Sequence, residues 1–381
     1  MTMEHFPPLP AHFNAEVEFP ILKHRAFFNH AGVAPLSNRA ALAMSQYIGE
    51  ARDDAYLTGN WYGKAETVRE DSARLMNAHS REIAFIKNTS EGLAFVANGL
   101  DWKSGDEVLS TAVEYPANVY PWMDLAQRFG VRHIMVPEQN GRIELDDILN
   151  AITPKTRMVS LSHVEYASGF RNDIAAIGKV CRERGVLFCV DAIQSLGVLP
   201  VDVQAMNIDY LSADGHKWLL GPEGCGVFFC REALLKSLRP EVGWMNVINA
   251  QDYGNYDFTL RDDARRFECG TYNIPGILSF GASVKLIHEF GIENIWRRVE
   301  ALTGRLCAGL ASKGYQVVSS RAANESSGIV SFTHAKLDHK AIVRQLQSQK
   351  ITIVLREGRM RASPHFYNSP EQIDRLLAAL P

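Results

Sequence analysis

The stretch that decides the fold runs from Val186 to Gly226 and reads VLFCVDAIQSLGVLPVDVQAMNIDYLSADGHKWLLGPEGCG. It begins with a short apolar strand that ends at Asp191, and Lys217 follows a second short apolar strand. A lysine amine can form a Schiff base with the aldehyde of pyridoxal phosphate (PLP), and an aspartate can keep the pyridine nitrogen of that cofactor protonated. The pair therefore predicts a PLP site in an enzyme that acts on amino acids.

Short apolar runs and amphipathic stretches alternate on both sides of this segment. Strands are expected at 83–86, 107–110, 131–136, 158–163, 186–190, 208–212 and 226–230. Helices are expected at 91–98, 121–129, 174–184 and 274–289. This alternation is typical of a largely parallel sheet with helices on both faces, so the expected fold class is α/β.

The length of 381 residues favours two domains over one. We expect a large cofactor-binding domain at 20–265. A small domain would combine 1–19 with 266–381, including an interdomain helix and a smaller mixed α/β unit with strands near 314–318, 328–333 and 351–355.

Composition narrows the class of partner. A formal net charge of -3 gives no basic stripe for nucleic acid and no polybasic membrane anchor, so a small molecule is the expected partner. The first eight residues lack the charged and apolar regions of a secretion signal, which predicts a cytoplasmic protein. The six cysteines are scattered without metal-ligand spacing, so no metal site is expected and buried apolar roles are favoured.

Asn88, Thr89 and Ser90 close one expected strand and begin the next helix. A helix start offers free N–H groups and a favourable dipole to an anion, and the cofactor phosphate is the natural candidate. Ordinary N-capping by Thr89 or Ser90 is the alternative. The glycines at 221–226 precede a strand, so they do not form a dinucleotide fingerprint, and the chain has no Walker A, His-Glu-x-x-His or Gly-x-Ser-x-Gly motif.

Several ordered motifs resemble the class V aminotransferases, which are fold type I PLP enzymes. The group includes cysteine desulfurases, selenocysteine lyases, kynureninases and isopenicillin N epimerases. The resemblance spans nearly the whole chain and rests on the motifs at 28–32, 88–92, 114–118, 190–194, 212–217, 224–226, 266–271 and 361–368. It implies a large domain with a mostly parallel sheet and a smaller C-terminal α/β domain.

The resemblance also implies roles for the cofactor residues. Lys217 would be the Schiff-base lysine, Asp191 the partner of the pyridinium nitrogen, and Gln194 a donor to the phenolic oxygen of the cofactor. The implied phosphate contacts are Thr89, Ser90 and His216. Thr271 matches a residue that reaches the phosphate of the neighbouring subunit, so the resemblance implies a homodimer with shared active sites.

Two further residues are implied to bind the substrate. Arg361 matches the arginine that holds the substrate carboxylate, a role that suits a bidentate guanidinium. Asn29 lies in the N-terminal segment that approaches the substrate in this family.

Each of these residues also has a purely structural interpretation. Asp191 and Gln194 could cap the turn after a buried strand, and Lys217 could be a surface lysine beside Trp218. Arg361 could form a structural salt bridge. The joint occurrence of the motifs favours the functional interpretation.

The chain departs from many desulfurase relatives at three places. Tyr115 stands where those relatives have a histidine that stacks on the cofactor ring; a phenol can stack but is a poorer proton shuttle at neutral pH. Asp214 replaces a serine, and we expect it to support His216 rather than touch the phosphate. The segment from Arg356 to Arg361 is short and has no cysteine, whereas desulfurases carry a nucleophilic cysteine shortly before the carboxylate-binding arginine.

These departures led to an expectation about the reaction. The chain is expected to act on an amino acid through an external aldimine, as a lyase or aminotransferase and not as a persulfide-forming cysteine desulfurase. An epimerase like isopenicillin N epimerase and a non-catalytic PLP reservoir are the alternatives. The sequence does not choose among elimination, transamination and epimerisation, and it does not identify the substrate.

Overall fold

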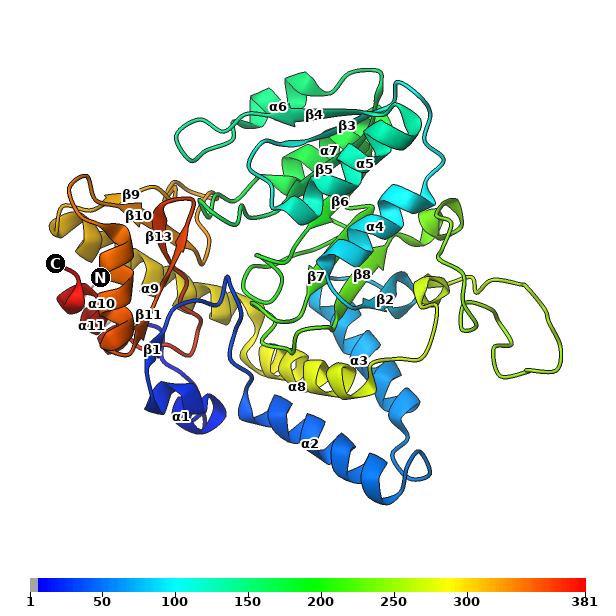
Figure 1. Ribbon diagram of the computed structural model, residues 1–381, viewed down its shortest axis with the longest axis horizontal. Coiled ribbons are helices and arrows are strands. Elements are labelled where there is room, and N and C mark those ends of the chain that lie inside the picture. Colours follow the sequence, from blue (N-terminus) through cyan, green and yellow to red (C-terminus); the bar gives the residue numbers. More distant parts are fainter. Residues whose placement is uncertain (1–5) are drawn as a thin grey trace.

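The computed structural model describes residues 6–381, so residues 1–5, where the expected small domain and the N-terminal segment begin, lie outside the described residues. A seven-stranded sheet forms the centre, in the order β2-β8-β7-β6-β5-β3-β4 (Figure 1). The strands are β2 (Ile83–Ile86), β3 (Glu107–Thr111), β4 (Arg132–Val136), β5 (Thr156–Ser162), β6 (Leu187–Asp191), β7 (Tyr210–Asp214) and β8 (Gly226–Cys230). β8 pairs antiparallel with both β2 and β7, and the other strand pairs of this sheet are parallel.

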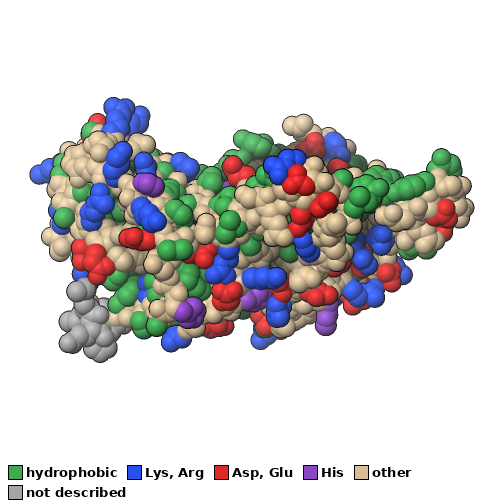
Figure 2. All heavy atoms as spheres, turned by 90° about the horizontal axis from the view of Figure 1, so that it is seen from below, with side chains coloured by type: hydrophobic (Ala, Val, Ile, Leu, Met, Phe, Trp, Pro, Cys, Tyr) green, Lys and Arg blue, Asp and Glu red, His purple; other side chains and the backbone are tan. Residues whose placement is uncertain are grey.

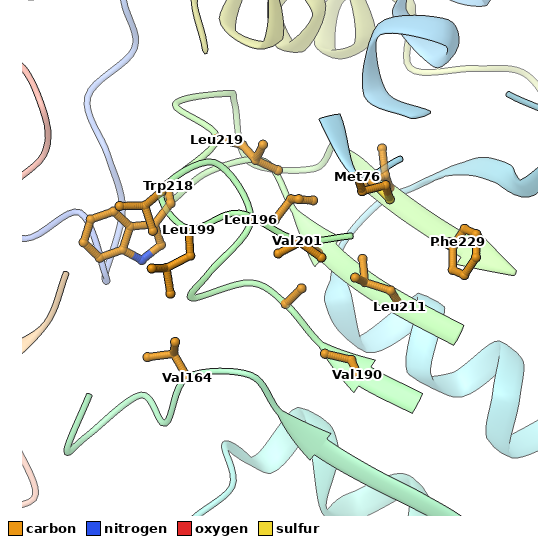
Figure 3. Close-up of a cluster of buried hydrophobic side chains, with 14 of the residues drawn as sticks. Met76, Val164, Val190, Leu196, Leu199, Val201, Leu211, Trp218, Leu219 and Phe229 are labelled. Atoms are coloured by element: carbon orange, nitrogen blue, oxygen red, sulfur yellow. The ribbon is translucent and has the colours of Figure 1, made fainter. Parts of the chain in front are cut away.

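The central strands are largely apolar and buried because both faces of the sheet are covered. Every residue of β7 and β8 is buried. Along β8, Val227 and Phe229 join the core on one face, while Phe228 and Cys230 join the core on the other. Figure 3 shows part of the first core, in which Val190, Leu211 and Phe229 lie among buried side chains. Such continuous apolar strands are typical of a doubly covered sheet, and the expected α/β class is confirmed.

Helices cover both faces of this sheet. One core includes residues of α4 (Thr89–Gly99) and α5 (Tyr120–Phe129). The other includes residues of α3 (Trp61–Leu75), α6 (Leu145–Ala151), α7 (Ile174–Arg184) and α8 (Ile274–Phe290). The long helix α2 (Asn38–Asp53) packs against α8 (Figure 1).

Local sequence signals set the ends of these helices. Asn88 caps α4, its side chain accepting a hydrogen bond from the Glu91 N–H at 3.0 Å. Asp173 caps α7 in the same way, and Gly185 ends that helix in the left-handed conformation at a φ of 69°. These caps fix where each helix begins relative to the strand before it, which positions the polar residues at the carboxyl edge of the sheet.

The C-terminal part forms a second, mainly antiparallel sheet in the order β12-β13-β10-β9. Its strands are β9 (Gln316–Val317), β10 (Val330–Thr333), β12 (Val354–Arg356) and β13 (Arg359–Ala362), and its helices are α9 (Ile292–Ser312), α10 (His339–Ser348) and α11 (Pro370–Ala379). The N-terminal strand β1 (Ala26–Phe27) pairs in parallel with β11 (Ile351–Thr352), and Ala26 and Phe28 join the C-terminal core. The domain boundaries at 20 and 265 stay a prediction.

The surface carries both signs of charge. Figure 2 shows Lys and Arg interspersed with Asp and Glu on the face it displays. Within residues 6–381, none of the helices combines the length and apolar character required to cross a bilayer.

Candidate active site

A cavity of about 350 Å³ lies at the carboxyl edge of the central sheet. It brings together nine of the ten residues that the sequence predicts for the site, namely Asn29, Thr89, Ser90, Tyr115, Asp191, Gln194, His216, Lys217 and Arg361. They come from the segment after β1, the N-terminus of α4, the loops after β3, β6 and β7, and strand β13. Ligands of open α/β sheets bind at this edge.

Asp191 and Lys217 face the same cavity from neighbouring strands. Asp191 is the last residue of β6, is 2% exposed, and accepts a hydrogen bond from the Ile193 N–H at 3.0 Å. Burial raises the pKa of Asp191 to about 6, opposed by that hydrogen bond and by the charge of Lys217. Burial also lowers the pKa of Lys217 to about 8, with Arg361 and Arg356 acting in the same direction and Asp191 against it.

The loop that carries Lys217 is held by short backbone contacts. Leu220 adopts a φ of 57°, which a non-glycine residue seldom does, and its N–H bonds the Lys217 carbonyl at 3.0 Å. The Ser283 hydroxyl donates to the Leu220 carbonyl at 2.7 Å. Gly197, at a φ of 96°, lies so near that an added Cβ would be 2.4 Å from the Trp218 carbonyl oxygen. The fold therefore fixes the backbone on both sides of the lysine.

The start of α4 offers donors to an anion. The Thr89 hydroxyl oxygen accepts a hydrogen bond from the Asp214 N–H at 3.0 Å, which leaves its own proton free to donate. Asp214 Oδ2 lies 2.9 Å from His216 Nδ1, but this nitrogen makes no hydrogen bond among residues 6–381, so the support of His216 by Asp214 stays a prediction. Ser90 is exposed and lines the same cavity.

The orientation of the Gln194 amide follows from its neighbours. The Trp218 indole N–H can only donate, and it lies 2.9 Å from Gln194 Oε1. Gln194 Nε2 donates to the Ala31 carbonyl at 3.1 Å, and its second proton has no other use among the described hydrogen bonds. Gln194, which is predicted to donate to the phenolic oxygen of the cofactor, therefore keeps one N–H of its amide available.

Arg361 is 1% exposed, although it carries a charge. Its Nη1 donates to the Tyr166 carbonyl at 2.6 Å and its Nη2 lies 3.5 Å from Asn29 Oδ1, while its Nε has no hydrogen-bond partner among residues 6–381. Burial and, to a smaller extent, the charge of Arg356 lower the pKa of Arg361 to about 9. The predicted alternative, a structural salt bridge, is not found for Arg361 in the described part of the chain.

Tyr115 is 49% exposed, and its ring centre lies 5.7 Å from Lys217 Nζ. It makes an edge-to-face contact with Tyr166, with ring centres 5.2 Å apart. Thr271 is separate: it is exposed and lines another hollow with Lys87 and Cys269. The prediction for Thr271 concerns a neighbouring subunit, and it stays a prediction.

Two residues that line the cavity, Tyr166 and Arg356, were not predicted from the sequence, and neither was a buried acidic pair that does not line the cavity. Tyr166 follows β5 by a few residues, and its place after a buried strand was the signal that could have found it. Glu114 and Glu165 are both buried and share the Thr111 hydroxyl, at 3.3 and 3.2 Å. Burial raises the pKa of Glu114 to about 7 and that of Glu165 well above its usual value. Only the fold reveals this pair.

The residues fit the chemical groups of PLP. The cavity offers an amine for the aldehyde, a buried carboxylate for the pyridine nitrogen, an aromatic ring for the face of the heterocycle and a helix start with hydroxyl donors for the phosphate. A buried guanidinium with a free Nε is left for a substrate carboxylate.

A sequence model of the family described as "Aminotransferase class-V" matches residues 27–376. The chain belongs to the class V aminotransferase family. A probable cysteine desulfurase of Methanothermobacter thermautotrophicus is 30% identical over 384 residues, covering 94% of each chain. A probable cysteine desulfurase of Streptomyces coelicolor is 31% identical over 398 residues, covering 95% of this chain and 94% of the relative.

Solved structures of a cysteine desulfurase and of a cystine C–S lyase share the fold. An apo cysteine desulfurase from Thermococcus onnurineus NA1 has a TM-score of 0.89 at 27% identity, with 97% of each chain covered. The cystine C–S lyase C-DES, in complex with its reaction product cysteine persulfide, has a TM-score of 0.87 at 28% identity, covering 94% of this chain and 98% of the lyase. This class V aminotransferase is a PLP-dependent enzyme of the transferase or lyase type.

One expectation about the reaction is wrong. The short cysteine-free hairpin led us to exclude a persulfide-forming cysteine desulfurase, yet the full-length relatives above are named cysteine desulfurases, and cysteine persulfide is the product named for C-DES. A thiol in this hairpin is not the only possible source of persulfide. Elimination from a disulfide substrate releases a persulfide without any protein thiol.

Proposed function

We propose that this enzyme cleaves the C–S bond of cysteine or cystine and releases the sulfur at the persulfide level. One observation carries the proposal: the Lys217 amine, the Asp191 carboxylate and the Arg361 guanidinium line one cavity. The full-length similarity to cysteine desulfurases and to a cystine C–S lyase supports the choice of substrate.

Lys217 and Asp191 would divide the work at the cofactor. When bound, PLP withdraws electrons from the α-carbon of an amino acid. Lys217 Nζ would take the α-proton, and its lowered pKa provides neutral amine near pH 8. Asp191, held by the Ile193 N–H, would keep the pyridine nitrogen protonated.

The other residues would hold the cofactor and the substrate in place. The proposed phosphate contacts are Thr89, Ser90 and His216, and Gln194 Nε2 would donate to the phenolic oxygen. Tyr115 would cover the ring face. Arg361 and Asn29 would bind the substrate carboxylate, whose charge would compensate the buried guanidinium.

Two reactions would release sulfur at the persulfide level, one from cystine and one from cysteine. In cystine, loss of the α-proton and breakage of the Cβ–S bond send the electron pair to sulfur and release cysteine persulfide; water uptake then yields pyruvate and ammonium. In cysteine, the sulfur passes to an acceptor thiol, which becomes a persulfide, and the Cβ takes up a proton to give alanine. Neither route needs an external oxidant or reductant.

Purified holoenzyme mixed with cystine, or with cysteine and a small thiol, tests the proposal. We expect persulfide trapped by an alkylating reagent, with stoichiometric pyruvate or alanine, and loss of both products in Lys217→Ala. A holoenzyme that forms keto acid only when a second keto acid is present, with no sulfur product, would overturn the proposal in favour of transamination.

We also propose a homodimer with shared sites. Six apolar side chains between η5 (Glu232–Ser237) and η6 (Ala264–Phe267) are exposed, from 42% for Trp244 to 99% for Tyr256. The segment projects from the body of the molecule and carries apolar side chains (Figures 1 and 2). Apolar patches of this kind usually mark an interface. Thr271, just beyond η6, would reach the cofactor phosphate in the partner subunit. A cytoplasmic location is a separate proposal.

A further inference from the structure

The active-site cavity contains one more cation than the roles above use. Lys217, Arg356 and Arg361 line it together with Asp191 and Asp214. Lys217 and Asp191 are assigned to the cofactor and Arg361 to the substrate carboxylate, while Asp214 lies against His216. Arg356 has no assigned role.

A tight hairpin fixes the backbone of Arg356. Strands β12 and β13 pair Arg356 with Arg359, and only Glu357 and Gly358 lie between them. Both turn residues have positive φ, 49° and 75°, as a two-residue type I′ turn requires. Arg356 and Arg361 therefore project from the same hairpin into one cavity.

Tyr166, on the loop after β5, contacts this hairpin both at its turn and on β13. Its carbonyl accepts the hydrogen bond from Arg361 Nη1 at 2.6 Å, and its hydroxyl donates to Glu357 Oε1. Glu357, the acid next to Arg356 in sequence, is thereby occupied, and burial together with Glu357 raises the pKa of Tyr166 to about 12. The phenol stays protonated and keeps the contact at physiological pH.

The Arg356 guanidinium is left without an acidic partner. Its hydrogen bond goes to the adjacent Leu355 carbonyl at 2.9 Å, and within residues 6–381 it forms no ion pair. Its charge acts on the site, because it lowers the pKa of both Lys217 and Arg361. An unpaired guanidinium beside a substrate cavity suits a carboxylate or a sulfonate.

We propose that Arg356 is a specificity-determining residue that binds an anionic group at the far end of the substrate side chain. The inference rests on the proposed C–S cleavage and names its substrate class: cysteine disulfides whose second half carries a carboxylate, as in cystine, or S-sulfonates. Free cysteine has no such group and does not use Arg356.

Three mixed disulfides of cysteine isolate this effect, because they share the scissile Cβ–S bond and differ only in distal charge. The partners are thioglycolate (anionic), methanethiol (neutral) and cysteamine (cationic), and pyruvate and persulfide release give kcat/KM. For the unmodified enzyme we expect kcat/KM to be highest for the anionic disulfide, lower for the neutral one and lowest for the cationic one. Arg356→Gln should lower kcat/KM about tenfold for the thioglycolate disulfide, within the range of a charge-assisted hydrogen bond, and less than twofold for the neutral one. Arg356→Lys should retain part of the preference.

Arg359→Gln is the matched control, since Arg359 lies opposite Arg356 on the hairpin and lines no part of the cavity; its nearest acid is Glu138 at 3.9 Å. It should leave the charge preference unchanged. Calorimetric titration of Lys217→Ala protein with the thioglycolate disulfide, with and without Arg356→Gln, gives a binding readout that does not depend on turnover.

Failure of this inference can be told apart from failure of the proposed function. Cleavage of all three disulfides with the same preference in Arg356→Gln as in the unmodified enzyme would overturn the role of Arg356 alone. No cleavage of any disulfide or of cysteine would overturn the proposed function. S-Sulfocysteine, cleaved with the same Arg356 dependence, would show that the site accepts a sulfonate as well as a carboxylate.

Discussion

Burial determines the behaviour of the two residues at the centre of the site. Asp191 and Lys217 both lie where the charged form is poorly solvated, so burial raises the pKa of the acid and lowers that of the amine. Their positions at strand ends could be predicted from the sequence, because an apolar run followed by a polar residue marks the carboxyl edge of a parallel sheet. The pKa directions could not, because they depend on side chains that only the fold brings near.

The raised pKa of Asp191 predicts a pH-dependent difference in stability between the unmodified apoprotein and its Asp191→Asn variant. The pKa of Asp191 is about 6 in the folded state, whereas the ordinary value for an aspartate in an unfolded chain is 3.8. The folded state therefore binds the proton more tightly, and the free energy of unfolding decreases as the pH rises from about 4 to about 6. One pKa unit corresponds to about 1.4 kcal/mol, so above pH 6 the cost is on the order of 3 kcal/mol. Asp191→Asn should stabilise the apoprotein by up to that amount at pH 7.5, and by about half as much at pH 5.

Denaturant unfolding of PLP-free protein at the two pH values measures this difference. Asp202→Asn, on a loop outside the cavity, serves as the control and should show no such pH-dependent gain. Equal stability of Asp191→Asn and unmodified apoprotein at pH 7.5 would show that the folded protein compensates the buried carboxylate.

Several residues were beyond the reach of the sequence for a physical reason. Arg356 and Tyr166 become site residues through a hairpin and a loop that are far apart in the chain and meet only in the fold. Thr271 was predicted from the sequence, but it lines another hollow of this chain, and its predicted role depends on a second subunit. By contrast, seven of the nine predicted residues that line the cavity converge because they end or follow a strand, or begin a helix, at one edge of the central sheet; Asn29 and Arg361 reach the cavity from the segment after β1 and from β13.

At the scale of elements, most central strands were predictable and several helices were not. The strands predicted at 83–86 and 226–230 coincide with β2 and β8. Their apolar runs are short, continuous and bounded by turn residues. Helices α2 and α3, which carry many charged residues, and the 21-residue α9 were not predicted. Packing against α8 and the C-terminal sheet stabilises them, and that information is not local.

The loop of Lys217 depends on the glycine it packs against. An alanine Cβ at Gly197 would lie 2.4 Å from the Trp218 carbonyl oxygen, and the residue also has a φ of 96°. Gly185 has a φ of 69° with nothing within 4 Å of its added Cβ, so Gly185→Ala should cost only the backbone strain of about 1 kcal/mol. Gly197→Ala should cost at least about 2 kcal/mol more, and it should weaken PLP binding.

Thermal unfolding and PLP titration of the two glycine variants provide the comparison. Weaker PLP binding by Gly197→Ala alone is expected, because only this substitution displaces the backbone beside Lys217. Similar stability and similar PLP affinity in both variants would contradict the close packing of the loop.

At the scale of the whole molecule, the proposed homodimer makes a distinctive prediction. If Thr271 serves the partner's phosphate site, Lys217→Ala and Thr271→Asp homodimers are both inactive. A mixed dimer then has one site with both defects and one with neither. Random exchange of equal amounts should restore about one quarter of the unmodified activity.

Sedimentation velocity checks the dimer, and affinity tags on the two variants check that subunits exchange. Exchange without recovered activity would place Thr271 outside the partner's site. Full activity of Thr271→Asp on its own would show that the phosphate does not need this residue.

Every role proposed for the cavity depends on the covalent attachment of PLP to Lys217, beside Asp191. Borohydride reduction of the holoenzyme, followed by proteolysis and mass spectrometry, tests this attachment most directly. We predict a phosphopyridoxyl group on Lys217, and none on any lysine in Lys217→Arg protein treated in the same way. A modified lysine elsewhere, such as Lys87 in the neighbouring hollow, with Lys217 unmodified, would contradict the account.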